Sequence, residues 1–186
     1  MKLSIPIFFL LSFFCVKSQT QINKTFESGI YTNFSDFKNN KPSIKLIGEI
    51  KPDDYKYGNL LDKKVMTYYF LKISKEESEK IGEIFGFSDG VNFYTSAYPH
   101  GIYDYEFYIL ESIGEKFMYF ESLKSSQYGE MHIQNTLNMD TGEINYLTNG
   151  RVKKILKDKP EIYEKFINQT DKPKYWKEYL IEYLKK

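Results

Sequence analysis

Residues 86–90 match the G-x-S-x-G pattern that surrounds the nucleophile of many serine hydrolases. In those enzymes the serine sits at a sharp turn between a strand and a helix, and a histidine acts as its base. The histidines downstream of Ser88 are His100 and His132. The run Val91–Thr95 favours a strand over a helix. We therefore interpret the pattern as a hairpin turn, with a small serine hydrolase that uses Ser88, His100 and His132 as the alternative.

A second short pattern, Asp140-Thr141-Gly142, copies the triplet of aspartic proteases. That chemistry needs two carboxylates that share a proton, and Glu143 follows where a small residue is expected. We interpret this triplet as a hairpin turn as well. His100 and His132 are isolated in the sequence, and we find no acidic or histidine partner at metal-ligand spacing from them. The sequence therefore predicts no metal and no cofactor.

Strands must position these residues, because from Gly29 to Leu147 the apolar residues mostly alternate with polar ones. The pair Asp89-Gly90 lies between two apolar runs, which is a strong hairpin signal since glycine supplies the positive φ of a tight turn. Two further hairpins are expected around residues 112–114 and 140–143.

Four other segments give specific expectations. Asn33 or Ser35 is expected to cap a single helical turn. A second strand over residues 44–50 should end at a turn over residues 51–54. Both faces of residues 65–73 are largely apolar, which predicts a central strand covered on each side.

After Gly150 the apolar period becomes helical. Three short helices are expected, the second opening at Pro160 and the third near Pro173. The third helix has an aromatic and apolar stripe around Trp176 that must be covered by another part of the protein. Its polar face carries charges of both signs, so we expect this helix to pack on the sheet and not to bind a membrane. The predicted fold class is α+β: a curled, mainly antiparallel sheet of hairpins with C-terminal helices packed on it.

The N-terminus predicts export. Lys2 precedes an apolar run from Leu3 to Val16, which is too short to cross a membrane and is typical of a secretory signal peptide. Cleavage after Ser18 removes 18 of 186 residues and leaves a single domain of 168, residues 19–186. The one cysteine, Cys15, lies inside this run, so the mature chain has none; a lipid-modified Cys15 is the alternative.

Composition excludes some partners. Without Lys2 and Lys17, 24 basic residues face 25 acidic ones, a net charge of −1 that does not favour nucleic acid. No second apolar run reaches transmembrane length. The 17 tyrosines and 15 phenylalanines indicate a β-rich aromatic core, with a carbohydrate-stacking surface as the alternative.

Three sets of motifs are spread over most of the mature chain. They are Gly29-Ile30-Tyr31 with residues 34–42, residues 86–90 with Tyr94, and Asn149-Gly150 with Leu156, residues 160–163 and Phe166. Together they resemble a group of uncharacterised exported proteins of Bacteroidota-type bacteria. The resemblance implies an envelope location and no known chemistry. The Ser18-Gln19 junction is also similar to the export signals of that group.

These observations predict a non-enzymatic envelope protein. We expect the concave sheet, lined by tyrosine and phenylalanine, to bind a small apolar ligand or a protein partner of the envelope. The sequence names neither the ligand nor the partner.

Overall fold

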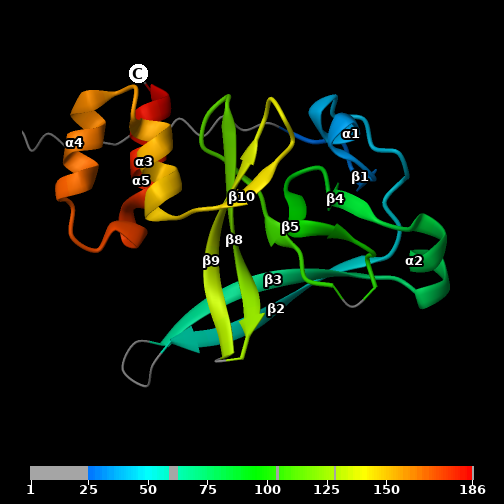
Figure 1. Cartoon of the computed structure of the whole chain (residues 1–186). Helices are drawn as coiled ribbons and strands as arrows, with labels where there is room; N and C mark the ends of the chain where they lie inside the picture. The colour runs from blue at the N-terminus through cyan, green and yellow to red at the C-terminus, as the bar shows by residue number, and fades with distance from the viewer. Residues whose placement is uncertain (1–24, 59–62, 104, 128, 186) are drawn as a thin grey trace, which may run out of the picture.

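The computed structural model describes residues 25–58, 63–103, 105–127 and 129–185. The expected signal peptide and Cys15 lie outside these residues. Strands and two short α-helices come first, and three α-helices and a 3₁₀ helix follow (Figure 1). The elements are β1 (Gly29–Tyr31), α1 (Phe34–Lys38), β2 (Glu49–Gly58), β3 (Lys63–Lys72), α2 (Lys75–Ile81), β4 (Ile84–Ser88), β5 (Phe93–His100), β6 (Tyr108–Ile109), β7 (Glu111–Ser112), β8 (Phe117–Ser126), β9 (Gly129–Asn138), β10 (Ile144–Tyr146), α3 (Asn149–Leu156), α4 (Pro160–Asn168), the 3₁₀ helix η1 (Lys172–Tyr175) and α5 (Trp176–Lys185).

The strands form two four-stranded sheets and a two-stranded ribbon, and the pairings between them are antiparallel. The first sheet has the order β1-β4-β5-β6, and the second has the order β10-β9-β8-β7. Only Leu110 separates β6 from β7, so one bent segment passes from the first sheet to the second. The predicted α+β class with antiparallel hairpins is confirmed.

Two of the predicted turns form as expected. Between β4 and β5, Asp89 Oδ1 accepts hydrogen bonds from the N–H groups of Val91 and Asn92, each at 2.7 Å, and Gly90 has a φ of +94°. Between β9 and β10, Gly142 has a φ of +76°. Both glycines adopt the left-handed region that other residues avoid.

The helical turn α1 also agrees with the prediction. Asn33 is its N-cap, and Asn33 Oδ1 accepts a hydrogen bond of 3.0 Å from the N–H of Asp36. Such a cap satisfies one of the N–H groups that the first turn of a helix leaves unpaired.

The β2–β3 ribbon differs from the prediction in two ways. Residues 51–54 lie within β2 and form no turn; Pro52 is tolerated there because β2 has a hydrogen-bonded partner strand on one side only. In β3, Met66 and Leu71 are buried on opposite faces, as expected of a covered strand. The prediction of a central strand is wrong, however, because β3 lies in a two-stranded ribbon with β2, and Val65 near its start is 56% exposed.

Helices α3, α4 and α5 pack against the second sheet and lie together at one side of the molecule in Figure 1. Their buried side chains, including the fully buried Phe166, form one core cluster with Phe117 and Tyr119 of β8. Trp176 is only partly buried, and its Nε1–H donates to Asn149 Oδ1 over 3.1 Å. The expected packing of the C-terminal helices on the sheet is confirmed.

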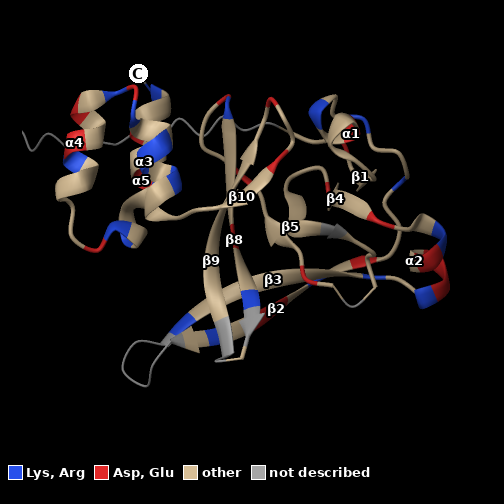
Figure 2. Cartoon of the chain, in the orientation of Figure 1, with Lys and Arg blue, Asp and Glu red and all other residues tan. Residues whose placement is uncertain are grey.

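The surface of the described residues carries both signs of charge. Figure 2 shows acidic and basic residues interspersed on α2 and on α4. Within the described part of the chain, no helix has the length and apolar character needed to cross a membrane.

Candidate functional site

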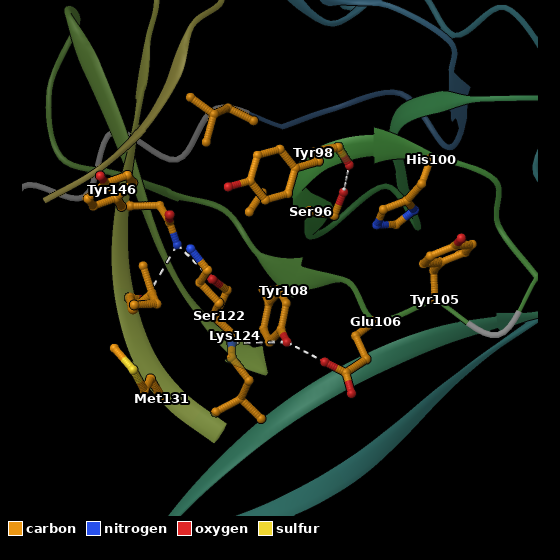
Figure 3. Close-up of a pocket in the computed structure, with 15 residues that line it drawn as sticks. Ser96, Tyr98, His100, Tyr105, Glu106, Tyr108, Ser122, Lys124, Met131 and Tyr146 are labelled. Atoms are coloured by element: carbon orange, nitrogen blue, oxygen red, sulfur yellow. Dashed lines mark hydrogen bonds between the residues drawn. The ribbon is translucent and has the colours of Figure 1, made fainter. Parts of the chain in front are cut away.

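A cleft of about 610 Å³ lies between the two four-stranded sheets (Figure 3). One wall comes from β5 and the segment that leads into β6, and the other comes from β8, β9 and β10. Small-molecule sites are commonly 300–1,000 Å³ in volume. The lining residues are Ser96, Ala97, Tyr98, His100, Tyr105, Glu106, Tyr108, Ser122, Leu123, Lys124, Met131, Ile133, Asn135, Ile144 and Tyr146.

A large bulge in β5 makes the first wall. Ile84 of β4 pairs with His100 and Gly86 pairs with Thr95, so the single residue Phe85 faces the four residues 96–99. Phe85 has no register partner in β5, and the Thr95 hydroxyl donates to its carbonyl over 3.0 Å. β-Bulges redirect side chains and are common beside functional sites. This one directs residues 96–98 to the cleft.

The rim of the cleft is exposed and apolar. Seven large apolar side chains among the described residues are exposed, and four of them line the cleft. They are Tyr98 (64% exposed), Tyr105 (47%), Met131 (50%) and Tyr146 (50%). Exposed apolar side chains that gather in one place indicate a binding surface, whereas single scattered ones do not.

The floor of the cleft is polar and buried. Asn135 of β9 is 2% exposed, and its Nδ2 donates to the Ser122 hydroxyl over 2.9 Å and to the Ile133 carbonyl over 3.3 Å. No described residue donates a hydrogen bond to Asn135 Oδ1. Among the described residues no fully enclosed side-chain oxygen or nitrogen lacks a partner, so this oxygen is not fully enclosed. This oxygen is therefore available to a molecule in the cleft.

A carboxylate stands at one end of the cleft, below Tyr105 in Figure 3. The Tyr108 hydroxyl donates to Glu106 Oε2 over 2.5 Å, and the N–H of Leu123 donates to the same hydroxyl over 3.1 Å. Tyr108 is buried, so this chain of hydrogen bonds fixes the direction of the Glu106 carboxylate.

His100 lines the same end of the cleft. Its ring stacks on Tyr105 at a centroid distance of 4.0 Å, and its Nδ1 lies 3.0 Å from the Gly101 carbonyl. Burial lowers the pKa of His100 below its ordinary value of 6.5, although the hydrogen bond to Gly101 opposes this shift. The neutral ring donates from Nδ1, which leaves Nε2 as an acceptor.

The structure does not bring Ser88 and His100 together. Ser88 is fully buried, and its Oγ accepts a hydrogen bond of 3.0 Å from the N–H of Gly90. In the register of the β4–β5 hairpin, Ser88 pairs with Phe93 and His100 pairs with Ile84. Four residues of strand, roughly 13 Å, separate these two positions.

His132 lies in the other sheet, on β9, and does not line the cleft. Its Nε2 is 2.8 Å from Glu121 Oε2, and its ring stacks on Tyr57 of the ribbon at 5.3 Å. The hydrogen bond from His132 is the largest cause of the lowered pKa of Glu121. His132 therefore joins the ribbon to the second sheet.

Comparisons with protein-family models, with curated proteins and with solved structures find no match to this chain. Among the described residues, no three or more histidine, cysteine, aspartate or glutamate side chains gather as metal ligands do.

Sequence reasoning found His100 and missed the other polar residues of the cleft. One signal was present: Asn135 occupies an apolar position in the alternation of Ile133 and Leu137. A polar residue on the buried face of a strand needs a partner, and such residues often mark a site. Glu106 and Tyr108 gave no comparable signal, because their contact depends on the bend between the two sheets.

Proposed function

We propose that this chain is an exported, non-enzymatic binding module that holds a small, mostly apolar molecule in the cleft between its sheets. The observation that carries the proposal is the β5 bulge, which puts Tyr98 at the rim of a cavity of suitable volume. Aromatic and aliphatic side chains supply most of the lining, and a few polar groups can orient a ligand.

The chemistry of the cleft favours binding over catalysis. A hydrolase of this size would need a nucleophile bonded to a base, or a pair of carboxylates. Among the lining residues, Glu106 is the one carboxylate and His100 the one imidazole. The Ser96 hydroxyl donates to the Tyr98 carbonyl, and the Ser122 hydroxyl accepts from Asn135. Neither serine is hydrogen-bonded to His100 among the described residues.

The neutral fluorescent probe N-phenyl-1-naphthylamine tests the proposal. We expect saturable binding of one probe per chain. Replacing Tyr98→Ala should weaken binding about fivefold, because one aromatic contact is lost. Tyr103→Ala is the matched control, since Tyr103 is also exposed (42%) but does not line the cleft. Both variants should keep the unfolding temperature of the natural chain.

Two results would contradict this function. One is probe binding that does not saturate, and the other is equal binding by the Tyr98 and Tyr103 variants. A blocking variant, Ala97→Trp, adds a second test, because the larger side chain would occupy the wall of the bulge. A folded Ala97→Trp chain that binds the probe as well as the natural chain would exclude the cleft as the site.

Export is the other part of the proposal, and it rests on residues 1–18, which lie outside the described residues. Expressed in a bacterial host, the mature protein should be found outside the cytoplasm with Gln19 as its first residue. A cytoplasmic protein that retains Met1 would overturn export, and a lipid-linked Cys15 would support the anchored alternative.

A further inference from the structure

Three polar atoms that line the cleft can only accept a hydrogen bond from a ligand, whereas the hydroxyls of the lining tyrosines can donate or accept. No described residue donates to Asn135 Oδ1, to Glu106 Oε1 or to His100 Nε2. Of the lining side chains, only Lys124 is cationic, and it is exposed to solvent, where its charge is screened. A ligand that pairs these three atoms therefore donates hydrogen bonds to them.

Glu106 concentrates this acceptor character at one end. Its Oε2 is occupied by the Tyr108 hydroxyl, so its Oε1 remains for a ligand. No described lysine, arginine or histidine forms an ion pair with Glu106. A carboxylate without a cationic partner at the end of a cleft attracts a cation.

An aromatic ring lies at the same end. Tyr105 is beside Glu106, and the His100 ring is stacked on it (Figure 3). The face of a tyrosine ring attracts an ammonium group, and the attraction increases when water is excluded. Because burial lowers the pKa of His100 below its ordinary value of 6.5, its ring is mainly neutral at pH 7 and repels such a group little.

We propose that the ligand of this cleft is a small organic amine, with its protonated ammonium group at Glu106 and an apolar, preferably aromatic, body along the cleft. The ammonium group donates to Glu106 Oε1 and contacts the Tyr105 ring. The body extends along the cleft towards Tyr146 at the opposite end. This inference rests on the binding function proposed above and specifies its ligand.

Three probes of the same shape and different charge test the inference at pH 7. They are 2-phenylethylamine (cationic), 2-phenylethanol (neutral) and 3-phenylpropionate (anionic), titrated calorimetrically or followed by NMR. We expect the amine to bind about tenfold more tightly than the alcohol, as a charge-assisted hydrogen bond predicts. The anion should bind least.

Glu106→Gln separates charge from shape, because the amide oxygen still accepts the hydrogen bond from Tyr108. It should weaken amine binding about tenfold and leave alcohol binding within about twofold. Glu115→Gln is the control, since Glu115 is exposed and outside the cleft. Glu106→Asp keeps the charge but retracts the carboxylate, and should bind the amine with an intermediate affinity.

The outcomes distinguish this inference from the function on which it rests. Two results would overturn the proposal of an amine ligand: equal binding of the amine and the alcohol, or an amine affinity that Glu106→Gln does not change. Either result would leave the proposal of a binding module for neutral ligands in place. If N-phenyl-1-naphthylamine and all three probes fail to bind, both proposals fall. If Glu106→Gln unfolds the chain, the Glu106→Asp variant and the ranking of the three probes test the amine instead. An amine that binds no more tightly than the alcohol would then overturn it.

Discussion

Gly142 and Phe34 are in such close contact that position 142 has no room for a side chain. A Cβ added to Gly142 would lie 2.5 Å from Cγ of Phe34, well inside van der Waals contact. Gly142 belongs to the turn between β9 and β10, and Phe34 begins α1. The contact fastens the tip of the last hairpin to the N-terminal helix, two elements far apart in the sequence.

Gly142→Ala should therefore destabilise the protein more than Gly90→Ala. Both glycines have positive φ, which costs another residue about 1–3 kcal/mol. At Gly90 the nearest atom to an added Cβ is 3.9 Å away, so the expected loss of stability comes from the positive φ alone. Overpacking against Phe34 should add about 1–3 kcal/mol at Gly142. Urea unfolding measures both, and equal losses would show that Phe34 simply moves aside.

The packing of the C-terminal helices predicts a second difference in stability. Phe166 is fully buried, so Phe166→Ala should reduce the free energy of unfolding by about 3–5 kcal/mol. Trp176 is only partly buried, and Trp176→Ala should cost about 1–3 kcal/mol. Thermal or urea unfolding compares them. A larger loss at Trp176 would mean that its hydrogen bond to Asn149 anchors the helices more than the packing does.

The hairpins and helices of this fold are readable from its sequence because their signals are local. Asp89-Gly90 and Asn33 act through hydrogen bonds to residues within three positions, so residue type alone indicates them. Pro52 misled the prediction for the opposite reason. Whether a proline ends a strand depends on whether a neighbouring strand needs its missing N–H, and β2 has only one neighbour.

The cleft was not predictable, because its parts meet only after the sheets have formed. The bulge over residues 96–99 depends on the register between β4 and β5, which no local pattern encodes. The contact between Tyr108 and Glu106 likewise requires Leu123 of another strand to hold the tyrosine. Of this site, the sequence indicated only His100 and Asn135, a polar residue at a position where the strand pattern is otherwise apolar.

Ser88→Ala tests the hydrolase alternative directly. The Ser88 hydroxyl bonds within its own turn, so its removal should cost about 0.5–1.5 kcal/mol of stability. Binding of N-phenyl-1-naphthylamine should not change, because Ser88 does not line the cleft. Hydrolysis of p-nitrophenyl acetate by the natural chain and by the variant provides the measurement. An esterase activity that Ser88→Ala abolishes, while the variant stays folded and loses no more stability than this, would establish the hydrolase in place of the binding module.

The burial of His100 predicts how stability changes with pH. Burial lowers its pKa in the folded chain, whereas in the unfolded chain the pKa stays near 6.5. Below pH 6.5 the unfolded state therefore binds a proton that the folded state does not. The stability that His100 contributes is complete above pH 6.5 and declines as the pH falls from there towards the folded pKa.

Urea unfolding at pH 7.5, 6.5 and 5.5 measures this decline. His100→Phe keeps a ring that can stack on Tyr105 and removes the titrating group, so its stability should vary less over this range than that of the natural chain. NMR titration of the His100 ring protons provides an independent check, with a midpoint expected below 6.5. A midpoint at or above 6.5 would show that the ring is charged near neutral pH, and a charged His100 would repel an ammonium group at Glu106.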